Sequence, residues 1–228
     1  AIYTVDKQIA RIIKALKKQN MLDTTIVLLT ADHGESLGEH GIHDHHGLYD
    51  CSVRIPLMLS MPGIAPRSIE SFVQTTDIMP TLLELLGIPS GAMAFDGSSL
   101  VDLMKGKGQQ LRDKVFFQEA FWEKKFAVRT DTFKLIVARN KDEATCSACH
   151  RVHGDGLIEL YDLVNDPHES VNRYREYPAL VASFTKDIME HYGEYYSEDH
   201  QSFPEDLTTT MSEEEKLIGA RLKDLGYY

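Results

Sequence analysis

The chain has 228 residues, of which 43% are hydrophobic and 26% are charged, a composition typical of a globular protein with a sizeable core. Lysines and arginines number 24 against 35 aspartates and glutamates, and the resulting net charge of −11 argues against nucleic acid as a partner. No apolar run approaches the ~20 residues that a membrane-spanning helix needs, and three cysteines are too few for a disulfide scaffold.

The first part of the chain has the pattern of an α/β protein. Apolar residues recur at helical spacing from Val5 to Leu16, which predicts an amphipathic helix, and Asn20 is a typical helix end. The apolar run Ile26–Thr30 follows without alternation, as in strands that are buried on both faces of a parallel sheet. A helix followed by a buried strand is half of a βαβ unit, so the sequence predicts a mostly parallel sheet flanked by helices.

The middle and end of the chain predict further short elements. A second buried strand is expected over 56–63, a helix over 78–86, and a surface connection over 90–114. Helices are also predicted over 178–192 and 212–225, the last with a capping box at Ser212 and Glu215. Between the 90–114 connection and the helix over 178–192, four segments rich in aromatic and β-branched residues predict antiparallel strands: Val115–Phe117, Lys125–Arg129, Phe133–Ala138 and Leu157–Leu163.

The expected organisation has two parts. Residues 1–110 form part of an α/β catalytic domain, and residues 111–228 form a small α+β subdomain with antiparallel strands. The chain begins almost inside a helix, and we expect it to be the rear part of a longer protein.

Polar side chains follow the first predicted strand directly. Asp32 and His33 offer a carboxylate and an imidazole, which divalent cations favour as ligands. Five of the ten histidines lie between residues 33 and 46. Because ligands bind beyond the carboxyl ends of strands in open α/β sheets, this loop predicts a metal or anion site. The alternative is a solvated loop whose histidines cap turns.

Five segments stand out along the chain: TADHGESLGEHG at 30–41, YDCSVRIPL at 49–57, TDIMPTLL at 76–83, LYDLVNDPHE at 160–169 and LGY at 225–227. Together they resemble segments of the type I sulfatases of the alkaline phosphatase superfamily. The first is similar to the family's second metal-binding segment, and the others follow in the family's order. The resemblance therefore extends from one end of the chain to the other.

The resemblance implies a role for the Asp-His pair. Asp32 would be a metal ligand, and His33 would be a second ligand or a donor to a substrate oxygen. The family's usual cation is calcium, while the imidazole of His33 leaves manganese or zinc open. A divalent cation would stabilise the negative charge that a sulfate ester gains during cleavage.

The sequence departs from the family in two places. His45 stands four residues before Tyr49, where the family often has a lysine that contacts the sulfate, so His45 is the candidate donor or general acid. His46 is the competing candidate, because it takes this place if the match to the family is shifted by one residue.

The second departure is the nucleophile, which the family generates as formylglycine from a Cys/Ser-x-Pro-Ser/Ala-Arg motif. This chain lacks that motif and the family's two N-terminal metal aspartates, and Cys51-Ser52-Val53-Arg54 has no proline. We therefore expect the chain to be inactive by itself.

A cysteine–histidine insert lies between two predicted strands. Cys146, Cys149 and either His150 or His153 have the spacing of structural zinc ligands. A disulfide between the two cysteines and a pair of free thiols are the alternatives. Cys-x-x-Cys-His also matches a haem attachment motif, but nothing else in the sequence indicates a haem pocket.

The leading functional hypothesis is a sulfuric ester hydrolase, present as a C-terminal portion that needs its missing N-terminal half. Its substrate would be a sulfate ester, for which sulfated carbohydrate is one class. The rivals are a phosphodiester or phosphonate monoester hydrolase of the same superfamily, and a non-catalytic metal- or carbohydrate-binding module. The resemblance suggests a periplasmic, extracellular or lysosomal location. The residues of the sequence themselves indicate no location.

Overall fold

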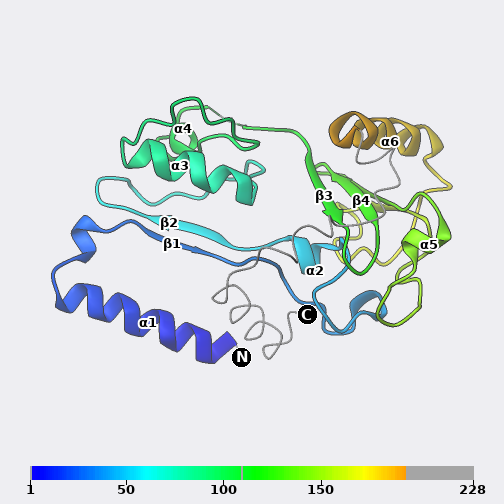
Figure 1. Ribbon diagram of the computed structural model, residues 1–228, viewed down its shortest axis with the longest axis horizontal. Coiled ribbons are helices and arrows are strands. Elements are labelled where there is room, and N and C mark those ends of the chain that lie inside the picture. The colour runs from blue at the N-terminus through cyan, green and yellow to red at the C-terminus, as the bar shows by residue number, and fades with distance from the viewer. Residues whose placement is uncertain (1, 109, 194–228) are drawn as a thin grey trace, which may run out of the picture. The chain divides into compact units, whose positions relative to one another are not determined.

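The computed structural model describes residues 2–108 and 110–193 (Figure 1). Residues 1–188 form one compact unit, and residues 189–228 form a second, of which only 189–193 are described. The predicted helix over 212–225, its capping box and the LGY segment lie outside the described residues. Within the described ranges, no helix is both long enough and apolar enough to cross a membrane.

The first helix, α1, spans Ile2–Lys18 and confirms the prediction from apolar periodicity. Its end is a Schellman motif: the N–H of Met21 donates to Leu16 O at 3.0 Å, and that of Asn20 donates to Lys17 O at 3.1 Å. Asn20 adopts the left-handed conformation that this motif requires, with φ of 55°. No residue of α1 is buried, although the helix is strongly amphipathic.

Two short strands form the first sheet. β1 spans Val27–Thr30 and β2 spans Leu57–Ser60. They pair antiparallel, with Val27 opposite Ser60 and Thr30 opposite Leu57. The parallel arrangement expected for this part is therefore wrong for these two strands. The chain returns through the 31–56 loop, which has only a single-turn α-helix, α2 at Asp50–Val53, in place of the crossover helix that usually joins parallel strands. Both strands are half-buried rather than enclosed on two faces.

A helical segment follows β2 in the chain. α3 spans Ile78–Leu85 and follows a 3-10 turn at Thr75–Asp77. The carboxylate of Asp77 is buried and accepts hydrogen bonds from the N–H groups of Gln74 and Ser98 and from Arg112. The connection expected over 90–114 contains a further short helix, α4 at Val101–Met104. Its residues Val101 and Leu103 are buried, so part of this segment belongs to the core rather than to the surface.

The second sheet has four antiparallel strands in the order β3-β4-β5-β6. The strands are β3 (Val115–Glu119), β4 (Lys125–Arg129), β5 (Phe133–Val137) and β6 (Ile158–Asp162), which confirms the predicted antiparallel sheet. Two helices accompany it: α5 at Lys141–Ala144 and α6 at Pro178–Tyr192, the latter with the predicted bounds. The fold is α/β in class, as expected.

The main hydrophobic core joins the 31–56 loop to this second sheet. It contains three loop residues, Ile42, Leu48 and Tyr49, together with the sheet residues Ala127, Ile136 and Tyr161 and with Leu163, which directly follows β6. The loop that carries the predicted site is thus packed on a rigid sheet rather than projecting into solvent.

Candidate functional site

Asp32 and His33 lie directly beyond the carboxyl end of β1, as the sequence predicted. The backbone N–H of His33 donates to Asp32 Oδ1 at 3.0 Å. The ring Nδ1–H donates to the carbonyl of Gly34 at 2.8 Å, which places the ring's lone pair on Nε2. Nε2 lies 3.7 Å from Asp32 Oδ2. An oxygen and a nitrogen at this separation can bind the same cation, because ligands of one ion lie roughly 3 to 4 Å apart.

His45 lies against His33. Their rings stack with centroids 4.2 Å apart and an interplanar angle of 19°. His45 Nδ1 lies 2.6 Å from Asp44 Oδ1. Glu35 completes the group, since one ligand atom each of His33, Glu35 and His45 lies within 4.8 Å of the others. Glu35 is a potential metal ligand that the sequence analysis did not identify. The only feature of the sequence that could have indicated it is its position in the TADHGE segment.

Backbone contacts fix this group. The N–H of Gly34 donates to Ser52 O at 2.7 Å, and that of Glu35 donates to Cys51 O at 3.1 Å. A Cβ at position 34 would lie 2.0 Å from Cys51 O, so only glycine allows this approach. The strand end that carries His33 is therefore held against the segment 49–54.

Tyr49 anchors the other end of the loop in the core. Its hydroxyl donates to Glu159 Oε2 at 2.6 Å, and the hydroxyl of Tyr161 donates to the same oxygen at 2.7 Å. Burial raises the pKa of both phenols well above their usual value. His40 stacks on the Tyr49 ring with centroids 3.6 Å apart, so this histidine packs in the loop rather than joining the group around His33.

The next residue, Asp50, forms a buried ion-pair cluster. Lys134 Nζ lies 2.5 Å from Asp50 Oδ1 and 2.6 Å from Glu169 Oε1, and Arg129 also pairs with Asp50, at 3.3 Å. Burial raises the pKa of Asp50, but the charges of Lys134 and Arg129 outweigh it and hold that pKa below its usual value. The cluster fixes α2 on β4 and β5.

The structure separates the two competing histidines. His46 faces the cysteine–histidine insert instead of His33, and its ring meets that of His153 edge-on at a centroid distance of 5.0 Å. One ligand atom each of His46, Cys146 and His153 lies within 4.8 Å of the others. Burial lowers the pKa of His46. His150 is exposed and belongs to neither group. The three cysteines are free thiols.

Glu119 is a half-buried carboxyl close to the same loop. Its Oε2 accepts a hydrogen bond of 2.6 Å from the N–H of Gly47. Burial, followed by the nearby charge of Glu123, raises the pKa of Glu119 to about 7, although the Gly47 bond lowers it.

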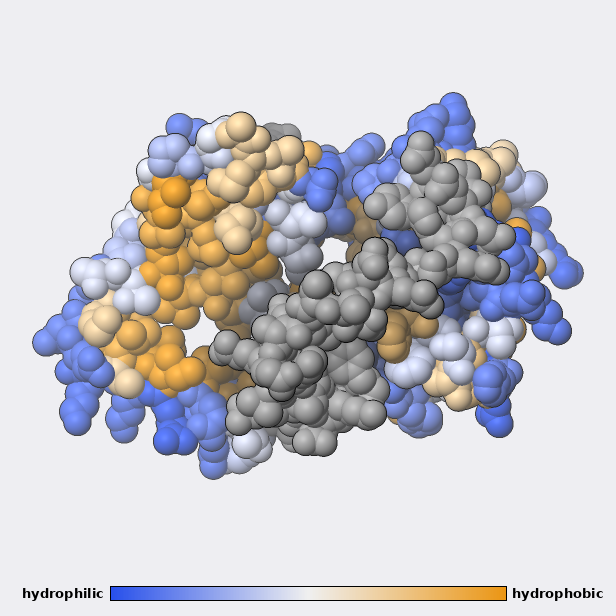
Figure 2. Space-filling view, viewed as in Figure 1, coloured by the Kyte–Doolittle hydropathy of each residue, from blue (hydrophilic) through white to orange (hydrophobic). Residues whose placement is uncertain are grey.

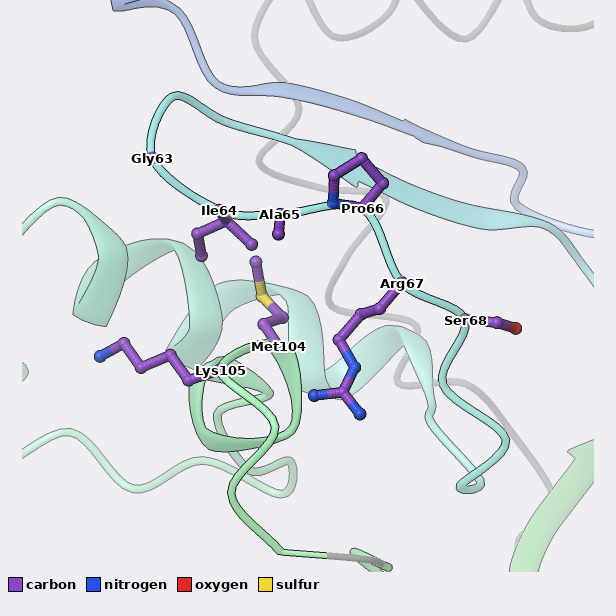
Figure 3. Close-up of a pocket in the computed structure, with 8 residues that line it drawn as sticks. All are labelled: Gly63, Ile64, Ala65, Pro66, Arg67, Ser68, Met104 and Lys105. Carbon is purple, nitrogen blue, oxygen red and sulfur yellow. The ribbon is translucent and has the colours of Figure 1, made fainter.

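An open pocket lies apart from these groups, between the segment after β2 and α4 (Figure 3). Arg67 is its main charged group, with Lys105 at the rim, and no residue of the Asp32–His46 segment lines it. The lining residues are Gly63, Ile64, Ala65, Pro66, Arg67, Ser68, Met104 and Lys105.

Comparison with known proteins identifies similar chains. The sequence profile of the Sulfatase family matches residues 1–88. A Formosa agariphila protein named "Sulfatase" is 31% identical over 169 residues, which cover 74% of this chain and 30% of that protein. A protein solved in complex with its substrate D-glucosamine-2-N,6-O-disulfate matches 88% of this chain and 41% of its own, with 25% identity and a TM-score of 0.71. The phosphonate monoester hydrolase of Agrobacterium radiobacter matches 85% of this chain and 40% of its own, with 28% identity and a TM-score of 0.64. The chain thus spans less than half the length of these proteins.

Proposed function

Because this chain belongs to the type I sulfatases of the alkaline phosphatase superfamily, we propose that it supplies part of the divalent-metal and sulfate-binding site of a sulfuric ester hydrolase. One observation carries the proposal. The ligand atoms of Asp32 and His33 lie 3.7 Å apart directly beyond β1, with the His45 ring stacked on His33.

Asp32 and His33 would hold the cation. The donor set fits a divalent metal, since a carboxylate oxygen and an imidazole whose Nδ1–H is already bonded to a carbonyl both offer lone pairs. Calcium fits the carboxylates of Asp32 and Glu35, whereas the imidazole favours manganese or zinc. When bound, the cation neutralises negative charge that develops on the ester oxygens.

His45 would contact the sulfate or the leaving oxygen. Asp44 lies 2.6 Å from its Nδ1 and can accept that N–H, which leaves Nε2 as the atom that meets the substrate. Stacking on His33 fixes the plane of the ring. A positioned imidazole can donate a proton to a leaving oxygen, as a lysine in the same place would. The separation of His46 from His33 supports His45 over His46 in this role.

The nucleophile and the other metal ligands would come from a polypeptide segment corresponding to the part of the relatives that this chain does not span. An apolar surface supports this part of the proposal. Figure 2 shows apolar side chains gathered over the region of α3 and β2, where Met58, Met79 and Leu86 are each more than half exposed. Patches of this kind are typical of interaction surfaces. We propose that the missing segment covers this face and that the chain alone is inactive.

A phosphonate or phosphodiester hydrolase of the same superfamily is the second candidate. The similarity to the phosphonate monoester hydrolase of Agrobacterium radiobacter favours it. Both functions use the same arrangement of a cation and a donor around a tetrahedral anion, so the geometry of Asp32, His33 and His45 fits either.

Metal binding by this chain tests the site directly. Calorimetric titration with Ca²⁺ and Mn²⁺ should show a site that Asp32→Asn and His33→Ala both weaken by more than tenfold. Asp23→Asn, an exposed aspartate outside the group, is the matched control and should not change the affinity. Unchanged affinity in Asp32→Asn would refute the assignment.

Activity tests the reaction. We expect no turnover of aryl sulfate or phosphonate esters by the 228-residue chain, and turnover by a protein extended to the length of its relatives. The ratio of the two activities in the extended protein decides between the sulfatase and the phosphonate hydrolase. Turnover by the chain alone would contradict the proposal that the nucleophile lies elsewhere.

A further inference from the structure

We propose that His46, Cys146, Cys149 and His153 form a closed, four-ligand structural zinc site that ties the 31–56 loop to the cysteine–histidine insert. This site is separate from the Asp32–His33 pair and does not depend on the function proposed above.

The four side chains converge although the loop and the insert are far apart in the sequence. One ligand atom each of His46, Cys146 and His153 lies within 4.8 Å of the others. The fourth side chain is adjacent, since Cys149 Sγ lies 3.1 Å from His153 Nε2. The ligand atoms of a tetrahedral zinc site lie about 3.3 to 3.8 Å apart, so zinc would draw His46, Cys146 and His153 together by about 1.5 Å or less.

The backbone of the insert brings its two cysteines together. The Cys149 side chain lies close enough to the Cys146 sulfur to interact with it, and the backbone N–H groups of Ala148 and Cys149 lie beside the same sulfur. Two neighbouring sulfurs from a Cys-x-x-Cys segment are a common half of a structural zinc site. His150 closes the turn: its N–H donates to Cys146 O at 2.8 Å and its φ is 58°. This role explains why His150 is exposed while His153 faces the sulfurs.

His46 is the zinc ligand that the spacing of the cysteine–histidine insert did not indicate. Both of its ring nitrogens are buried and have no hydrogen-bond partner among the described residues. Buried polar atoms nearly always have a partner in native structures. A metal ion bound by one nitrogen would satisfy it. His46 also brings the number of ligands to the four that structural zinc sites require.

The surroundings hold the insert in place. Lys125 is buried and donates to the backbone carbonyl of His153 at 3.0 Å, while its Nζ pairs with buried Glu123 at 2.9 Å. The N–H of Ser147 donates to Trp122 O at 2.8 Å, which attaches the turn to the β3–β4 connection. Zinc with two thiolates and two neutral imidazoles has no net charge, so it adds none to this buried ion pair.

The test measures zinc in the full 228-residue chain prepared with zinc and reductant. We expect mass spectrometry of the metal to show one zinc per chain that His33→Ala retains. Cobalt in its place should give the thiolate charge-transfer and d–d absorption of a tetrahedral site. His46→Ala and Cys149→Ser should each weaken zinc binding more than about 100-fold, because even partners outside the ligand shell contribute about 10- to 100-fold. His43→Ala and His150→Ala, exposed histidines from the same two segments, are the matched controls and should retain the metal.

Three results would overturn the proposal. The first is a chain that binds no zinc under these conditions, or in which mass and thiol titration show a disulfide between Cys146 and Cys149. The second is zinc affinity in His46→Ala equal to that of His43→Ala, which would remove the fourth ligand. The third is loss of the zinc in His33→Ala, which would assign it to the other group. Because Cys149 is exposed, its serine variant should fold and keep the test decisive.

Discussion

Replacing Lys134 by methionine should strongly destabilise the chain. Lys134 is fully buried, and its ammonium contacts Asp50 Oδ1, Glu169 Oε1 and the carbonyl of Leu48, the last at 3.1 Å. The side chain of Glu169 is only 2% exposed, so it has no access to solvent once the lysine is removed. Methionine fills a similar volume, and the variant therefore removes the charge without leaving a large cavity.

The expected loss follows from the charges left behind. Removing one partner of a buried ion pair costs about 3 to 5 kcal/mol, because the other partner stays buried and uncompensated. Here two carboxylates lose their shared cation, while Arg129 still pairs with Asp50 at 3.3 Å and reduces the penalty. We expect a loss of about 3 kcal/mol in the free energy of unfolding at pH 7, measured by urea denaturation. The control Lys14→Met, at an exposed position of α1, should stay within about 0.5 kcal/mol of the parent.

The pH dependence separates this charge effect from poor packing. The pKa of Asp50 is held below its usual value in the folded chain, so its contribution is present above the unfolded pKa and is lost as pH falls through the folded pKa. In Lys134→Met part of this depression disappears, and protonation relieves the repulsion between the carboxylates. The difference between parent and variant should therefore shrink from pH 7 towards pH 4. A difference below about 1 kcal/mol at pH 7, or one that does not change with pH, would refute the reasoning.

Three further predictions concern stability. The pKa of Glu119 is raised to about 7, so the parent should lose stability as the pH rises through 7. Glu119→Gln, whose amide oxygen can still accept the hydrogen bond from the Gly47 N–H, should remove on the order of 2 kcal/mol of that loss. Equal slopes of stability against pH for parent and variant between pH 5 and 8 would contradict this. Arg112→Met leaves the buried carboxylate of Asp77 without its cation and should cost about 3 kcal/mol in urea denaturation; a cost below 1 kcal/mol would mean that the backbone donors suffice. Asn20→Ala should lower the helicity of α1 in circular dichroism and cost about 1 kcal/mol, whereas Asn20→Gly should be neutral, because only alanine is strained at a φ of 55°.

Local patterns in the sequence predicted the elements well. Apolar periodicity and the Asn20 signal were sufficient for α1, and the bounds of α6 agree with the prediction. The four strands of the second sheet follow from their aromatic and β-branched composition between turn residues. The position of Asp32 and His33 at a strand end was also predictable, because it depends on residues that are adjacent in the chain.

The relative direction of β1 and β2 was not predictable, nor were the contacts between residues that are far apart in the sequence. The apolar run of β1 suits a buried strand in either orientation, and only the path of the 31–56 loop decides that β2 returns antiparallel. His45 and His46 are adjacent and chemically identical, so their opposite neighbours depend on the tertiary fold of the loop. His46 meets His153 and Cys146 only because the loop packs on the second sheet. No spacing in the sequence carries that information.

The shared core has a practical consequence for anyone who dissects this protein. Ile42, Leu48 and Tyr49 are among the least exposed residues of the chain, yet their partners Ala127 and Ile136 belong to the second sheet. Expressing residues 1–110 without the remainder would expose these side chains to water. It would also remove Glu159, the hydrogen-bond acceptor of the Tyr49 hydroxyl. Any split-protein or deletion study of the histidine loop therefore needs the second sheet in the same polypeptide, and the shortest useful expression unit has to extend at least through β6.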